Sequence, residues 1–130
     1  MKTFKKSILA LGLTLGIIAS FGGAAFAASE AYGHINSYAT SGRSRAFATT
    51  AEARTVSATK GTVTVYSEYS YVNVSNLTTG KVTRNAGGNN TYVASLAFTA
   101  PKNCRSVKIK SSHVVYALGE LWNANTDANY

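Results

Sequence analysis

Residues 62–74 read TVTVYSEYSYVNV, and this stretch decides the class of fold. Apolar and polar side chains alternate along it: one side carries Val63, Val65, Ser67, Tyr69 and Tyr71, and the other carries Thr62, Thr64, Tyr66, Glu68 and Ser70. Alternation with period two over this length is typical of a half-buried β-strand, because successive side chains point to opposite faces of a sheet. We expect the side with Tyr69 and Tyr71 to pack into the core.

Other parts of the chain also favour strands. Residues 92–98 place Tyr92, Ala94, Leu96 and Phe98 on one side, and residues 107–115 place Val107, Ile109 and Val115 opposite Lys108 and Lys110. Shorter strands are expected at 31–40, 43–50 and 81–85. Residues 51–59 are ambiguous, because Thr49 and Glu52 have the spacing of a helix capping box while the β-branched residues that follow favour a strand. We favour the strand.

Turn signals separate these segments. They are Ser41-Gly42, Ser75-Asn76 with Thr79-Gly80, Gly87-Gly88-Asn89-Asn90, Pro101 with Lys102-Asn103, and residues 117–120. Short strands at regular spacing with turns between them predict an all-β fold, a small antiparallel β-sandwich of about seven short strands.

The first 27 residues have the pattern of a bacterial Sec-type secretory signal peptide. Three lysines precede an apolar run, and Ala25-Phe26-Ala27 supplies small residues at the positions before a cleavage site. Glycines dilute the run, so a transmembrane anchor is not expected. The sequence therefore predicts a secreted protein with one mature domain, residues 28–130.

The net charge of the chain limits the classes of binding partner that we expect. The full chain has a formal net charge of +8, and removal of the three signal-peptide lysines leaves +5 on the mature domain. A net positive charge favours encounter with anionic partners such as cell-wall polymers or an acidic surface protein. The basic residues are dispersed and no aromatic-basic motif stands out, so nucleic acid is not an expected partner.

Few residues could carry catalysis or bind a metal. Cys104 is the single cysteine, expected in a loop between Lys102 and Arg105 as an exposed free thiol that could form a disulfide-linked dimer. Cys104 and His113 are the one conceivable nucleophile and base, and they could meet only if the strand between them folded back. His34 and His113 lack a recognisable set of further ligands. We therefore expect no enzyme, no metal and no cofactor, and the alternation places His113 on the inner side of its strand.

Aromatic and basic residues supply the candidate binding set. Eight tyrosines and one tryptophan are a heavy aromatic load, and tyrosine offers a flat contact surface with a polar tip. Those expected to be exposed lie near basic residues in the sequence or on the polar side of a strand. The candidate binding residues are Tyr32, His34, Tyr38, Arg43, Arg45 and Tyr66.

The chain resembles the small exported β-rich proteins of Gram-positive bacteria. The resemblance rests on the Ala25-Phe26-Ala27 signal end, on strands rich in Ser, Thr and Ala, and on Ser112-His113 followed by Gly119 and Trp122. Many such proteins have no assigned function and some are bacteriocins. We expect an exported, non-enzymatic binding module for an anionic cell-envelope polymer or surface protein. The alternatives are a secreted bacteriocin-like antibacterial protein and a self-assembling extracellular structural protein.

Overall fold

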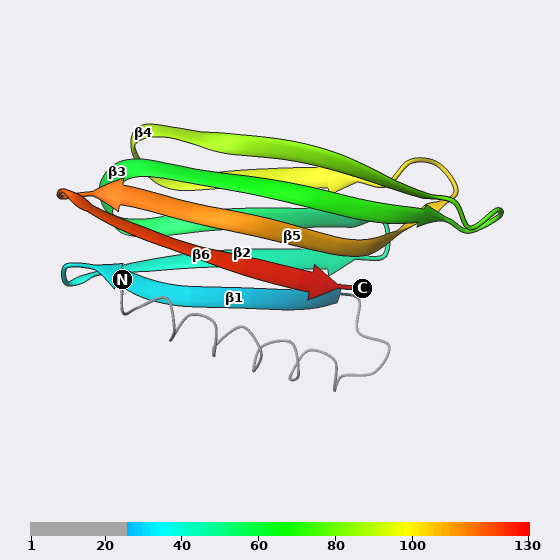
Figure 1. The fold of residues 1–130 in the computed structure, drawn as a ribbon, viewed down its shortest axis with the longest axis horizontal. Helices are drawn as coiled ribbons and strands as arrows, with labels where there is room; N and C mark the ends of the chain where they lie inside the picture. The colour runs from blue at the N-terminus through cyan, green and yellow to red at the C-terminus, as the bar shows by residue number, and fades with distance from the viewer. Residues whose placement is uncertain (1–25) are drawn as a thin grey trace.

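The computed structural model describes residues 26–130, an antiparallel all-β fold of six strands (Figure 1). The strands are β1 (Phe26–Ile35), β2 (Tyr38–Phe47), β3 (Thr50–Asn73), β4 (Thr79–Thr99), β5 (Cys104–Ala117) and β6 (Glu120–Asn129). This range contains no helix long and apolar enough to cross a membrane. The predicted signal peptide lies outside the described residues up to residue 25, and its last two residues, Phe26 and Ala27, begin β1.

The two longest strands organise the sheet. β4 pairs along one edge of β3 for nearly its whole length, while the opposite edge of β3 pairs first with β2 and then with β5. β1 continues the sheet beyond β2, and β6 continues it beyond β5. The sheet therefore has a first half, β1-β2 with the start of β3 and the end of β4, and a second half, β5-β6 with the remainder of β3 and β4.

These two halves face each other. The β3-β4 pairing shifts its register between Val56 and Gly61 and again between Gly61 and Val63, and such irregularities bend a strand pair. The sheet curls until β6 contacts β1 and β2, so that its form is nearly that of a barrel (Figure 1). The two outward surfaces of the curled sheet are therefore separate faces of the molecule.

The predicted turn at Ser41-Gly42 is wrong. The chain reverses instead at Asn36-Ser37, where Asn36 has a left-handed φ of 53°, and Gly42 lies in the middle of β2. A β-carbon on Gly42 would overlap the ring of His113 on β5. This glycine is therefore required by the close approach of a side chain from the opposite half of the sheet and not by a turn.

The second misleading signal is Gly87-Gly88-Asn89-Asn90, which lies within β4. Gly87 and Asn90 have φ values of 137° and 58°, and they lie opposite the irregular part of β3. Residues that permit positive φ here bend the long hairpin without reversing it. The predicted strands at 81–85 and 92–98 are consequently parts of one strand, and six strands are present in residues 26–130 where about seven short ones were expected.

Most of the inside and outside assignments are confirmed. Residues 51–59 are strand, and Val63, Val65 and Tyr69 are fully buried. Val107 is an exception at 38% exposure, because the ladder skips it where Ser70 pairs with Lys108 and Tyr71 with Ser106. The extra residue of this bulge turns outward. Burial raises the pKa of Tyr69, whose hydroxyl lies 2.7 Å from Ser106 Oγ.

The core combines many small residues with a few large ones. Trp122 is its largest fully buried side chain and lies on β6. The indole ring lies against Gly33 of β1, where a β-carbon would overlap it. Glycines on β1 and β2 thus make room for the large side chains of β5 and β6.

Candidate functional site

Three arginines gather on the outer surface of the first half of the sheet. Register places Arg43 of β2 directly opposite Arg54 of β3, and Arg45 opposite Glu52. Glu30 of β1 lies opposite Arg43 on the other side. The even-numbered residues of β3 and the odd-numbered residues of β2 point outward here. The residues between them are buried, and side chains alternate between the two faces of a strand. We call Glu30, Arg43, Arg45, Glu52 and Arg54 the arginine face.

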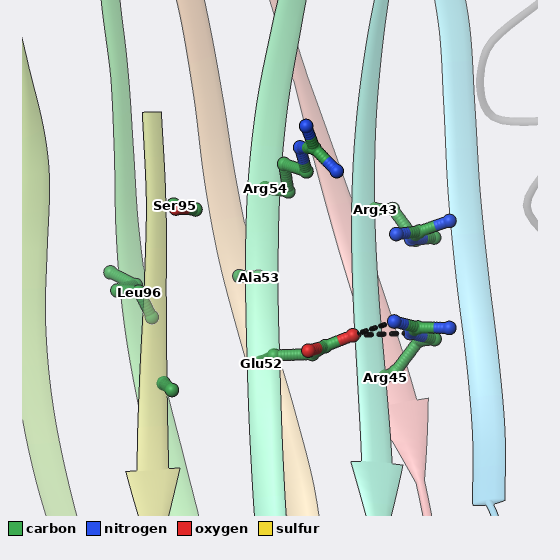
Figure 2. Close-up of a pocket in the computed structure, with 8 residues that line it drawn as sticks. Arg43, Arg45, Glu52, Ala53, Arg54, Ser95 and Leu96 are labelled. Carbon is green, nitrogen blue, oxygen red and sulfur yellow. Dashed lines mark hydrogen bonds and ion pairs between the residues drawn. The ribbon is translucent and has the colours of Figure 1, made fainter. Parts of the chain in front are cut away.

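Each of the two carboxylates of the arginine face accepts a hydrogen bond from a neighbouring side chain. Arg45 forms an ion pair with Glu52 and also donates to it through Nε, and Glu30 accepts a hydrogen bond from the Tyr32 hydroxyl. Figure 2 shows Glu52 reaching from β3 to Arg45, while Arg43 and Arg45 point toward β1. Across residues 26–130, no carboxylate forms an ion pair with Arg43 or Arg54. Arg43 and Arg54 thus face each other across the strands without an ion pair, and Glu30 lines a smaller hollow together with both of them.

Arg45 also contacts aromatic rings at the start of β1 and the end of β2. Its guanidinium carbon lies 5.8 Å from the ring centre of Phe26 and 5.6 Å from that of Phe47. Cleavage after Ala27 would remove Phe26 and leave the contact with Phe47. The ion pair and the ring contact restrain Arg45, whereas Arg43 and Arg54 remain available to a ligand.

A hollow of about 450 Å³, open to solvent, lies beside the arginine face. It is lined by Arg43, Arg45, Glu52, Ala53, Arg54, Ser95, Leu96 and Ala97. Like charges directly opposite each other on neighbouring strands repel, so an anion placed between Arg43 and Arg54 would relieve a cost that the free protein carries. The guanidinium fork presents several N–H donors in the geometry that phosphate and carboxylate oxygens accept. The arrangement is thus suited to binding an anion.

The predicted binding residues do not all lie on the same surface of the protein. Tyr32 and His34 are exposed on the outer side of β1, on the same surface as Arg43 and Arg45. Tyr38 is exposed at the β1-β2 turn. Tyr66 is 51% exposed but lies on the outer surface of the second half of the sheet. Tyr32 and His34 therefore lie on the same surface as the arginines, whereas Tyr66 does not.

Sequence reasoning did not find Arg54. Its alternation with Ala51 and Ala53, once residues 51–59 are taken as a strand, would have placed Glu52 and Arg54 together on an outer face. The opposition of Arg54 to Arg43 is a property of the register between β2 and β3 and has no local signal.

Cys104 is the first residue of β5 and is buried, at 9% exposure, so the predicted exposed loop thiol is wrong. The residues between Cys104 and His113 run along one extended strand, which separates the two by roughly 30 Å at about 3.3 Å per residue. They cannot act as nucleophile and base. A buried thiol reaches the thiol of a second copy only after local opening, so a disulfide-linked dimer no longer follows from the exposure of Cys104.

The native thiol of Cys104 is expected to react slowly with Ellman's reagent, because thiolate chemistry requires access to the sulfur. In denaturant the same sample should release one equivalent of chromophore at once. Rapid and complete reaction of the folded protein would show that the start of β5 opens readily.

The two histidines lie apart. His34 is exposed on β1, whereas His113 is fully buried on β5. Among residues 26–130, no group of three His, Cys, Asp or Glu side chains could hold a metal ion.

His113 is surrounded by buried hydroxyl groups from four strands, which we call the hydroxyl cluster: Ser44, Thr55, Ser67, Ser111 and Thr126. Thr55 Oγ1 donates to the Thr64 carbonyl and lies 2.8 Å from His113 Nδ1, and Thr126 Oγ1 lies 2.7 Å from His113 Nε2. Because the Thr55 hydroxyl proton goes to the Thr64 carbonyl, His113 Nδ1 carries a proton and donates it to Thr55 Oγ1.

The hydroxyl cluster offers His113 no counter-charge. Its hydroxyls also contact one another, with Ser44 Oγ 2.6 Å from Ser111 Oγ and Ser111 Oγ 2.7 Å from Ser67 Oγ. The fully buried polar side chains of residues 26–130 include no carboxylate. Burial lowers the pKa of His113 from 6.5 to about 4, because desolvation disfavours the charged imidazolium. The cluster is a closed structural unit and not a site open to a ligand.

Comparison with known proteins adds little. No protein-family model and no curated protein matches the chain. The solution structure of R. palustris CsgH is similar at 8% identity over 78% of this chain and 91% of that one, with a TM-score of 0.29. The X-ray structure of the structural-genomics target SoR45 is similar at 10% identity over 80% and 84%, with a TM-score of 0.26. Likeness at these scores carries no argument about function.

Proposed function

We propose that this protein is an exported, non-enzymatic binding module that holds an anionic cell-envelope polymer on its arginine face. The observation that carries the proposal is the opposed pair Arg43 and Arg54, which forms no ion pair with a carboxylate of the described residues. Export follows from the predicted signal peptide, and the charge of +5 on the mature domain would favour encounter with a polyanion.

We further infer that the two facing halves of the sheet act as the two layers of a small β-sandwich. In a sandwich the inner surfaces form the core and the outer ones are free for contacts. A flat outer surface with two unpaired guanidinium groups suits successive anionic groups of an extended polymer better than a small molecule, because the hollow is open to solvent.

The test is binding of the mature protein to Gram-positive cell walls, before and after chemical removal of their anionic polymers. Replacing both Arg43 and Arg54 by alanine should weaken binding to intact walls at least about tenfold, the scale of losing charge-assisted hydrogen bonds. Binding of the unaltered protein should fall as salt rises, because exposed charges are screened within about 8 Å at physiological ionic strength.

The matched control is Lys102→Ala with Arg105→Ala, which removes the same charge from two exposed positions, one in the loop before β5 and one at the start of β5. This variant should retain most of the binding. Equal losses from both double variants would show that net charge alone acts, and unchanged binding of the Arg43→Ala, Arg54→Ala protein would overturn the arginine face as the site.

A further inference from the structure

A second surface, on the other outer face of the sheet, is centred on Tyr66. Strand pairing places Tyr66 of β3 between Asn85 of β4 and Ser112 of β5, and Ser112 in turn pairs with Asn125 of β6. All four residues are exposed. This row, which we call the tyrosine row, crosses four strands and contains no charged side chain.

Tyr66 separates two adjoining hollows. One, of about 380 Å³, extends from Tyr66 toward Glu68, Lys110 and Asp127. The other, of about 420 Å³, extends toward Thr64 and Val114 and along Gly87-Gly88, which contribute no side chains that could fill it. A ring that lies on Tyr66 therefore has room for neighbouring units on both sides.

The polar groups of the tyrosine row are largely unused within the protein. Ser112 donates to Oδ1 of Asn125 over 2.9 Å, and the Asn125 amide protons have no acceptor among the residues that the structure describes. Within residues 26–130, no hydrogen bond is found to the Tyr66 hydroxyl or to the side chain of Asn85. Amide and hydroxyl groups both donate and accept, as the hydroxyl groups of a sugar do.

The charges beside the tyrosine row are balanced locally. Glu68 Oε2 lies 3.6 Å from Lys81 Nζ, and Asp127 Oδ2 lies 3.9 Å from Lys108 Nζ. Lys110 lies between Glu68 and Asp127 in the register. Because each carboxylate has lysine neighbours and the row itself is uncharged, this surface is complementary to an uncharged polar ligand, in contrast to the unpaired cations of the arginine face.

We propose that the tyrosine row binds an uncharged glycan chain. The face of one sugar ring packs on the Tyr66 ring, and the amides of Asn85 and Asn125 with the Ser112 hydroxyl bind sugar hydroxyls. Neighbouring sugars of the chain occupy the two hollows. The site is separate from the arginine face, so the protein could hold a neutral glycan and an anionic polymer on opposite surfaces.

The test is co-sedimentation with insoluble neutral polysaccharides, namely chitin, cellulose and an insoluble β-glucan, at low and at high salt. The unaltered protein should bind at least one of them equally at both salt concentrations. Tyr66→Ala should weaken that binding at least about tenfold, as truncation of a central aromatic contact does, and Tyr66→Trp should retain it.

The matched control is Tyr116→Ala. Tyr116 is 52% exposed on the same outer face but does not line either hollow, so its loss should leave binding unchanged. Circular dichroism should show both variants folded. The proposal is overturned if no neutral polysaccharide binds, if salt abolishes binding, or if Tyr116→Ala loses as much as Tyr66→Ala.

The Arg43→Ala, Arg54→Ala protein separates the two proposals. It should bind the neutral polysaccharide normally while losing the anionic walls, and Tyr66→Ala should show the reverse. Loss of both ligands by either protein would mean that one surface serves both, and that the assignment of an uncharged glycan to the tyrosine row is wrong.

Discussion

Replacing Trp122 by alanine is expected to lower the free energy of unfolding by about 3–5 kcal/mol, as truncation of a buried tryptophan does. Trp122 is 1% exposed and packs against Gly33, which has no side chain that could move into the space left behind. The cavity would therefore persist. Urea denaturation followed by circular dichroism measures the change.

Two further variants separate cavity formation from other causes. Leu121→Ala, at a neighbouring position that is 40% exposed, should change the free energy of unfolding by less than about 1 kcal/mol. Trp122→Phe should cost less than Trp122→Ala, since the indole nitrogen is buried without a hydrogen-bond partner in the described structure and its removal breaks no such bond. Equal effects of Leu121→Ala and Trp122→Ala would contradict the packing described for β6.

Acid is expected to destabilise the protein between pH 6.5 and about 4 through His113. The pKa of His113 is about 4 in the folded protein, against the reference value of 6.5 expected on unfolding. Within this window the unfolded chain binds a proton that the folded protein does not, so the free energy of unfolding falls as pH falls. The full loss from this residue is roughly 3 kcal/mol, at about 1.4 kcal/mol for each pKa unit.

The measurement is urea denaturation across this pH range. His113→Gln, which cannot titrate, should lose the pH-dependent part of the stability while being less stable at neutral pH, because its amide does not match the contacts of the ring. His34→Gln, at the exposed histidine, should keep the pH dependence of the unaltered protein. If His113→Gln retained the full acid dependence, another group would have to be its source.

Local pattern was enough to predict which side chains turn inward. Val63, Val65 and Tyr69 are buried, Tyr66 is exposed, and His113 lies on the inner side of β5, as alternation indicated. Alternation succeeds because the direction of successive side chains in a strand is set by backbone geometry and needs no knowledge of the neighbouring strand.

Turn predictions from the local sequence were wrong where a glycine has a role other than in a turn. Gly42 after Ser41 has the pattern of a turn, yet it makes room for His113 from the opposite half of the sheet. Gly87-Gly88 has the pattern of a chain reversal, yet it permits a bend within β4. The same residue type satisfies a turn, a close contact and a bulge, and only the surroundings distinguish them.

The sequence by itself determined an all-β chain, the inner and outer sides of its main strands, and a basic surface with many exposed tyrosines. The tertiary structure alone decided that Arg43 faces Arg54, that Tyr66 lies on a different surface from the arginines, and that Cys104 is buried. The physical reason is that alternation acts between adjacent residues, whereas register joins residues far apart in the chain and follows from how the whole sheet pairs and curls.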